Sequence, residues 1–180
     1  MTQTLVATAS QTVGPFFHLA GNMDLACVAR PGVPGERIRL TCRVFDGDGV
    51  PVPDALIELW QADANGIYSD PAFGGFGRLA SDENGICVFE IVRPGRVAGP
   101  NGAPEPQSPH INLIVFARGL LKHLYTRVYF AGDPANDDDA ILAMIPGERR
   151  ATLIAQAAAP DAWNFEIHLC GDRETVFFDI

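Results

Sequence analysis

The sequence predicts a mainly β protein, a β-sandwich of antiparallel or mixed sheets with one or two short helices and long loops. Short apolar segments alternate with clusters of glycine, proline, aspartate and asparagine along most of the 180 residues. Such spacing is typical of strands joined by turns. Two stretches depart from this pattern, and one of them has the features of a helix.

The expected strands share apolar and β-branched residues bounded by turn signals. The first, R-I-R-L-T-C-R-V-F-D, alternates polar and apolar residues, as a strand with one buried face does. It runs into D-G-D-G, a strong turn signal. The expected strands cover residues 37–46, 55–61, 86–92, 111–118, 124–130, 163–169 and 174–180.

The remaining segments predict helices and loops. Acidic residues precede an apolar run in residues 133–145, which indicates a helix start, and Pro146 with Gly147 ends it. Residues 148–159 are expected to form a second helix. The loop 94–109 holds five of the fourteen prolines, and a loop of that length is usually functional or mobile. G-G-F-G, residues 74–77, is expected to be a flexible turn.

Length and charge bound the class of protein. We expect one domain, residues 1–180, with an N-terminal arm over about residues 1–35. The net charge of -9 argues against nucleic acid and anionic membrane as partners. No apolar run is long enough to span a bilayer, and the first residues lack the pattern of a signal peptide. These features indicate a cytoplasmic protein.

Cysteines and histidines are the residues most easily linked to chemistry. The four cysteines are widely separated, and Cys42, Cys87 and Cys170 lie in apolar runs, as reduced cysteines acting as small hydrophobes do. His168 alternates with Glu166 on an expected strand, and His123 lies in an expected solvated turn. The candidate metal ligands are His18, His110, His123, His168 and Tyr68.

Several motifs occur in a characteristic order. W-Q-A-D-A-N-G-I-Y at residues 60–68 is followed by G-G-F-G-R, R-P-G, P-H-I-N and T-R-V-Y-F. This series resembles the intradiol ring-cleavage dioxygenases over nearly the whole chain. S-Q-T-V-G-P-F near the start, F-A-R-G in the middle and E-T-V-F-F-D-I at the end are similar to the iron-free α chains of two-chain members. The family fold, a β-sandwich with helices and long loops at its edges, agrees with the strand pattern.

The resemblance also predicts that this chain has lost part of the family's iron site. Iron-binding chains of the family use two tyrosines and two histidines. These positions fall on Tyr68, Val97, His110 and Asn112. Valine offers no donor atom, and an amide oxygen is a weak ligand for hard ferric iron. The resemblance therefore implies a degenerate metal site here and Fe(III) bound by a homologous partner chain, the β chain.

Two further positions of the family's active site differ in this chain. The arginine that precedes the first histidine in the family, and is thought to stabilise charge during ring attack, falls on Gln107. A neutral glutamine further along falls on Arg127. The resemblance implies O2-dependent intradiol cleavage of protocatechuate to β-carboxy-cis,cis-muconate by the complex, with no catalytic residue in this chain.

Residues of this chain would then complete the partner's substrate pocket. The resemblance assigns Gly14 and Pro15 to the pocket wall, with Thr12 beside them, and Arg118 to the substrate carboxylate. Alternatively, the arm docks through Phe16 and Phe17, and Arg118 forms a salt bridge.

Two other classes of function stay open on the residues alone. One is an autonomous metalloenzyme that uses Tyr68, His110 and another histidine. The other is a non-catalytic β-sandwich module that binds a small molecule.

Overall fold

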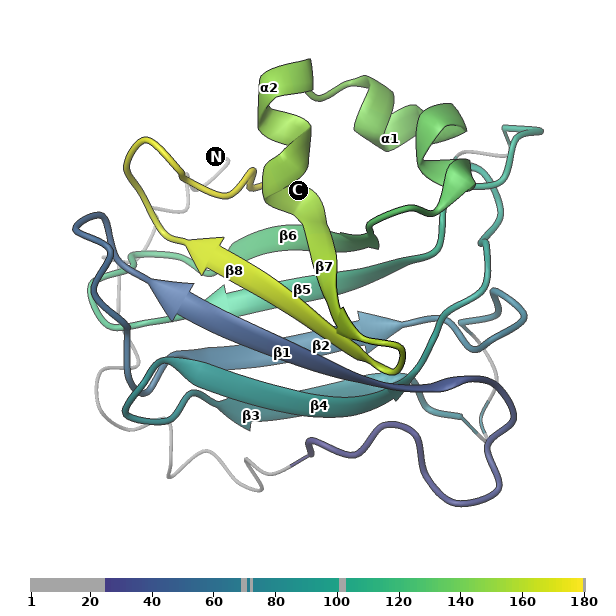
Figure 1. Cartoon of the computed structure of the whole chain (residues 1–180), viewed down its shortest axis with the longest axis horizontal. Coiled ribbons are helices and arrows are strands. Elements are labelled where there is room, and N and C mark those ends of the chain that lie inside the picture. Colours follow the sequence, from purple (N-terminus) through teal and green to yellow (C-terminus); the bar gives the residue numbers. More distant parts are fainter. Residues whose placement is uncertain (1–24, 69–70, 72, 101–102, 180) are drawn as a thin grey trace, which may run out of the picture.

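The computed structural model describes residues 25–68, 71, 73–100 and 103–179. Its strands form one continuous mixed sheet in the order β3-β2-β5-β6-β7-β8-β1-β4, folded into two layers (Figure 1). We call β3-β2-β5-β6 sheet A and β7-β8-β1-β4 sheet B. The strands are β1 (Arg37–Phe45), β2 (Leu56–Gln61), β3 (Phe76–Ala80), β4 (Ile86–Val92), β5 (His110–Phe116), β6 (Leu124–Phe130), β7 (Ile154–Ala159) and β8 (Ala162–His168).

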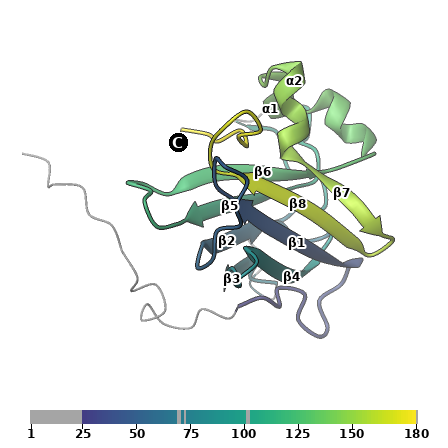
Figure 2. The same ribbon diagram turned by 60° about the vertical axis from the view of Figure 1, so that its left-hand side comes forward.

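Most neighbouring strands are antiparallel, and the two parallel pairs are β1 with β8 and β6 with β7. The seam between the sheets is short, because β6 and β7 pair only at Tyr129 with Ile154 and at Phe130 with Ala155. Short helices between β6 and β7 gather at one end of the sandwich (Figures 1 and 2).

Strand periodicity places the core between the sheets. On β5, Ile111, Leu113 and Val115 are fully buried against sheet B. The alternate residues of β5, including His110 and Asn112, point to the outer face of sheet A, because successive side chains of a strand alternate. The same alternation buries Leu40 and other inward residues of β1.

Mainly β architecture with short helices is confirmed, and strands overlap six of the seven expected segments. The segment 174–180 is not a strand over its described residues, which make only an isolated bridge between Phe178 and Tyr125. The expected turn at residues 74–77 is partly wrong, because β3 begins at Phe76. Glycine suits this strand at Gly77, where a Cβ would come within 2.9 Å of the Val28 side chain.

The expected helix over residues 148–159 is wrong in its second half. Helix α2 (Gly147–Arg150) and the 3-10 helix η4 (Ala151–Leu153) are followed by β7. Alanine favours helix, but pairing with β8, with Gln156 opposite Asn164, overrides that local preference. Residues 133–145 divide into η3 (Pro134–Asp138) and α1 (Ala140–Ala143).

The cysteine prediction holds for two of three residues. Cys42 and Cys87 are fully buried opposite each other on β1 and β4, and burial raises the pKa of the Cys87 thiol to about 12. Cys170 is exposed, because β8 ends at His168. All four cysteines are free. His168 lies on β8 with its Nε2 3.2 Å from Glu166 Oε2, as expected. No helix in the described ranges is long and apolar enough to cross a membrane.

Arg93 covers the aromatic residues at one end of the core. Its guanidinium carbon lies 4.4 Å from the ring centroid of Phe130 and 5.2 Å from that of Trp163. Its Nη2 lies 3.0 Å from Asp133 Oδ2, before η3. The arginine thus links the loop after β4 to the helical connection between β6 and β7.

We therefore expect Arg93→Ala to lower the free energy of unfolding by about 1–2 kcal/mol, through lost cation–π and ion-pair contacts. Urea unfolding measures the change. Arg39→Ala, on the exposed side of β1, removes the same charge and should change the free energy by less than about 0.5 kcal/mol. Equal losses in the two variants would contradict a specific role for Arg93.

Candidate polar site on sheet A

A cluster of polar residues lies on the outer face of sheet A. Strand β5 directs His110 and Asn112 to this face, and the loop after β2 brings Tyr68 over them. The Tyr68 Oη lies 3.3 Å from His110 Nε2 and 2.8 Å from Asn112 Nδ2. Three of the four residues at the expected metal positions therefore form one hydrogen-bonded group.

The fourth position, Val97, is buried in the long loop before β5. Its carbonyl accepts a hydrogen bond from the Gln107 N–H at 2.9 Å. The neighbouring backbone of Arg96 packs against Gly66 so closely that no Cβ would fit there. Val97 thus lies next to the turn that carries Tyr68, but its side chain ends in methyl groups and has no atom that could bind a metal.

The amide of Asn112 is fully engaged. Its Nδ2 donates to Tyr68 Oη at 2.8 Å and to the Trp60 carbonyl at 3.3 Å. Its Oδ1 accepts a short hydrogen bond from the hydroxyl of Tyr125 on β6. The side chain therefore acts as a bridge between two tyrosines, and its oxygen is already occupied.

The direction of the hydrogen bonds can be worked out from His110. Its Nδ1 lies 2.8 Å from the Ser108 carbonyl, which can only accept, so Nδ1 carries the hydrogen. Nε2 then accepts from the Tyr68 hydroxyl, which itself accepts from Asn112. The result is a directed chain from Tyr125 through Asn112, Tyr68 and His110 to the carbonyl of Ser108.

Burial favours the neutral forms of His110 and Tyr68 in this chain. Burial, with a smaller effect from the nearby Arg127 charge, lowers the pKa of His110 to about 4. Burial also raises the pKa of the Tyr68 phenol. A ferric ion would have to displace the Tyr68 proton and the hydrogen bond to His110 to gain a phenolate ligand.

Arg127 brings a fixed positive charge to the cluster. It lies opposite Asn112 in the pairing of β5 with β6. Its Nη1 donates to Gln107 Oε1 at 2.8 Å and to Tyr129 Oη at 3.4 Å. Gln107 stands at the position where the family has an arginine, and Arg127 at the position where it has a glutamine. The two residues therefore contact each other directly.

These donors do not fit a ferric ion. Val97 has no ligand atom, Asn112 is hydrogen-bonded to two tyrosines, and the Arg127 guanidinium repels cations. Across the described part of the chain, no group of three or more histidine, cysteine, aspartate or glutamate residues could hold a metal.

Asp139 fixes the start of β5, where this cluster begins. Its Oδ2 accepts from the Ser108 N–H at 2.7 Å. Its Oδ1 accepts from the N–H groups of Ile141 and Leu142, both at 2.9 Å, and caps α1. The Tyr129 hydroxyl donates to the same oxygen at 3.3 Å. Sequence reasoning treated this residue only as part of an acidic helix start, because the contact with Ser108 joins distant parts of the chain.

Arg118 is placed far from the cluster. It follows β5 at the opposite end from His110, roughly 25 Å away along an extended strand. Its side chain is exposed and makes no hydrogen bond or ion pair with any other described residue. The other expected substrate-pocket residues, Thr12, Gly14 and Pro15, lie outside the described residues.

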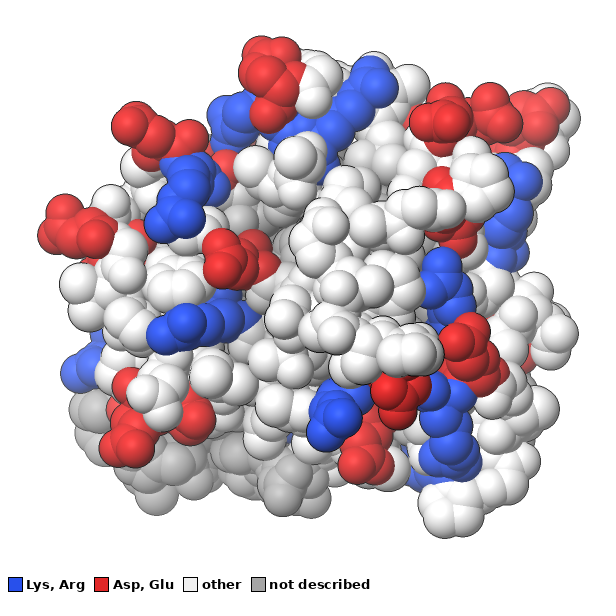
Figure 3. Space-filling model, viewed as in Figure 1, with Lys and Arg blue, Asp and Glu red and all other residues white. Residues whose placement is uncertain are grey.

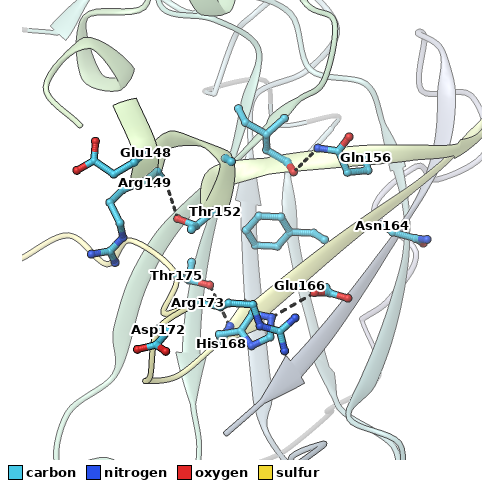
Figure 4. Close-up of a pocket in the computed structure, with 13 residues that line it drawn as sticks. Glu148, Arg149, Thr152, Gln156, Asn164, Glu166, His168, Asp172, Arg173 and Thr175 are labelled. Carbon is cyan, nitrogen blue, oxygen red and sulfur yellow. Dashed lines mark hydrogen bonds and ion pairs between the residues drawn. The ribbon is translucent and has the colours of Figure 1, made fainter. Parts of the chain in front are cut away.

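A separate hollow of about 550 Å³ lies on the outer face of sheet B (Figure 4). It is bounded by α2, η4, the strands β7 and β8, and the residues after β8. Its charged lining includes both signs, and Arg149 is tied to the Glu174 carbonyl at 2.9 Å. Figure 3 shows a broad uncharged area at the centre of this face, with charged residues around it. The sequence did not indicate the hollow, because β7 was expected to be helical.

The buried imidazole predicts a pH-dependent stability. Between pH 6.5 and 4 the unfolded chain protonates His110 while the folded chain does not, so stability falls as the pH falls. From pH 7.5 to pH 5, this residue should remove about 2 kcal/mol of the free energy of unfolding. Denaturant unfolding of His110→Gln should show a correspondingly weaker pH dependence than the unmodified chain. His123→Gln, at an exposed position, is the control, and identical pH dependence in both variants would contradict the assignment.

Known proteins with similar sequences are dioxygenase chains. A family model described as Dioxygenase matches residues 13–171. The chain is 41% identical to the protocatechuate 3,4-dioxygenase alpha chain of Pseudomonas putida, with 98% of each chain aligned. It is 38% identical to the alpha chain of Burkholderia cepacia over 98% of this chain and 99% of that one. The beta chain of Burkholderia cepacia is 36% identical over 82% of this chain and 66% of its own length.

Solved structures share the fold. The dioxygenase domain of a dioxygenase carbohydrate-binding protein fusion from Streptomyces sp. SirexAA-E superposes with a TM-score of 0.66 at 24% identity, covering 94% of this chain and 99% of that one. The hydroxyquinol 1,2-dioxygenase of Pseudomonas putida DLL-E4 superposes with a TM-score of 0.65 at 23% identity, covering 92% and 67%. From the near-complete match to the family model and the near-full-length relatives, it follows that this chain belongs to the intradiol ring-cleavage dioxygenase family.

Proposed function

We propose that this chain is the α chain of a two-chain protocatechuate 3,4-dioxygenase. The observation that carries the proposal is the 41% identity to such an α chain, aligned over 98% of both proteins. The hydrogen-bonded cluster around Tyr68 and His110 supports it, because these residues suit a chain that holds no iron of its own. In this proposal Fe(III) is bound by the homologous β chain, in keeping with the family's use of iron.

The proposed reaction is O2-dependent cleavage of protocatechuate between its two hydroxyl-bearing carbons. Both oxygen atoms enter the product, β-carboxy-cis,cis-muconate. The chemistry takes place on the β chain, and this chain contributes no catalytic group. Its proposed role is to complete the substrate pocket from outside. The free thiols of all four cysteines suit a reducing compartment, and the cytoplasm is the proposed location.

Arg118 is the proposed contact to the substrate. Its guanidinium is exposed and has no acidic partner among the described residues. A planar guanidinium binds a carboxylate with two parallel hydrogen bonds, and protocatechuate carries one carboxylate. On a chain with a net charge of -9, such a cation would also offset the repulsion of an anionic substrate.

Thr12, Gly14 and Pro15 are proposed to line the same pocket. Their assignment rests on the resemblance of S-Q-T-V-G-P-F to the family's α chains. Glycine lets backbone approach a ligand closely, and proline fixes the backbone in one shape. We propose that residues 1–180 form one domain and that the first 35 or so residues act as its arm.

We expect Arg118→Ala in the co-expressed complex to raise KM for protocatechuate about 10-fold while changing kcat less. Steady-state oxygen uptake measures both constants. Arg39→Ala, which removes an exposed arginine from sheet B, is the control and should leave KM unchanged. An unaltered KM in the Arg118 variant would remove this residue from the substrate site.

Metal content provides an independent test. The chain purified alone should be colourless and contain less than about 0.1 iron per chain, because its donor set does not suit a hard trivalent cation. Elemental analysis and visible absorption measure this, with the α/β complex as the control that carries iron. Stoichiometric iron with a tyrosinate-to-iron absorption band in the isolated chain would favour an autonomous metalloenzyme instead.

The hollow on sheet B favours one alternative, a non-catalytic β-sandwich module that binds a small molecule. Its volume of about 550 Å³ is within the range of small-molecule pockets. That function requires a stable monomer indifferent to the β chain. Co-expression with the β chain, followed by measurement of assembly mass, iron content and oxygen uptake, separates the two functions. A chain that neither joins the β chain nor affects its activity would refute the α-chain proposal.

A further inference from the structure

The turn between β5 and β6, residues 117–123, is an ordered protrusion with an apolar tip. Figure 2 shows this end of β5 and β6 projecting from the body of the sandwich. The Leu120 N–H donates to the Ala117 carbonyl at 3.3 Å, and Gly119 takes a left-handed conformation with φ of 87°. The His123 ring packs on Phe116 at 5.6 Å between centroids. Leu121 at the tip is 73% exposed.

A hollow of about 250 Å³ lies beside this turn. One wall is formed by residues 122–125 and the other by residues 177–179 of the C-terminal segment. The segment is held in place because the Phe178 N–H donates to the Tyr125 carbonyl at 2.8 Å, and Thr126 Oγ1 donates to the Val176 carbonyl at 2.8 Å. The turn and the hollow together present a projecting side chain next to a recess.

The charge of the turn is opposite to that of the whole chain. It contains Arg118 and Lys122 and no acidic residue, whereas the chain carries a net charge of -9. Lys122 pairs with Asp179 at 2.9 Å, but both side chains are mostly exposed, so solvent screens the pair. A surface that meets this turn is best matched by an apolar recess with acidic residues around it.

We propose that the turn 117–123 and the adjacent hollow are a docking surface for the homologous β chain, with Leu121 as its apolar anchor. This inference rests on the proposed function. If Arg118 reaches a substrate held by the β chain, the turn faces that chain, and Leu121, three residues further along, lies within about 10 Å of the Arg118 backbone. Contact at this turn would remove the exposed Leu121 side chain from water, and burial of apolar surface is the main favourable contribution to most protein–protein association.

The anchor and the substrate contact have separable roles. Leu121 has no polar atom for the substrate, so its removal should weaken association of the chains. Arg118 lies toward β5, and its removal should change substrate binding within an assembled complex. The same turn thus carries one residue for assembly and another for the substrate.

The test compares Leu121→Asp with Met144→Asp in the full-length chain. Met144 follows α1, is 76% exposed and provides a matched apolar-to-acidic change elsewhere on the surface. Sedimentation of the purified chain titrated with the β chain measures the dissociation constant. We expect Leu121→Asp to weaken association at least 10-fold, Leu121→Ala to weaken it less, and Met144→Asp to leave it unchanged. Circular dichroism and thermal unfolding of each isolated variant verify that it is folded.

The outcomes separate this inference from the proposed function. If the unmodified chain binds the β chain and Leu121→Asp binds equally well, the docking surface is refuted and the proposed function stands. If the unmodified chain does not join the β chain, the proposed function itself fails. If the unmodified chain forms homodimers that Leu121→Asp abolishes while β binding is unaffected, the surface is a contact between copies and the proposal is overturned.

Discussion

The buried carboxylate of Asp139 is the interaction on which the arrangement of sheet A and its helices depends. One oxygen receives the Ser108 N–H at the start of β5, and the other caps α1 and receives the Tyr129 hydroxyl. Four donors offset the cost of burying this charge. The carboxylate thereby joins the helical connection between the sheets to the start of β5. This link determines the position of His110, the first residue of β5.

From that point the outer face of sheet A follows from hydrogen bonding. The Ser108 carbonyl fixes the tautomer of His110, the imidazole orients the Tyr68 hydroxyl, and Asn112 links Tyr68 to Tyr125. Because each buried group finds a neutral partner, the cluster needs no metal to satisfy it. The Arg127 charge, linked to Gln107, makes the same face unfavourable for a cation.

The sequence was a good guide where a segment's own pattern decides its structure. Alternation along residues 37–46 predicted β1, and the short apolar run at residues 86–92 predicted β4. The family resemblance placed Tyr68 and His110 in one site, and these two residues do meet. Prediction failed where distant partners decide. β7 is a strand because β8 pairs with it, and the hollow on sheet B exists only once that strand is formed. The roles of Asp139 and Tyr125 likewise depend on contacts between segments that no local pattern reveals.

The directed hydrogen-bond chain also limits how this protein could change over evolutionary time. Replacing Asn112 by histidine would remove the amide oxygen that accepts from the Tyr125 hydroxyl, and Val97 would still supply no ligand. A change at Asn112 alone therefore disrupts a satisfied network without completing a set of iron ligands. Arg127 would have to change as well. The path back to an independent catalyst requires several coordinated substitutions, so a division of labour between two chains, once established, is difficult to reverse.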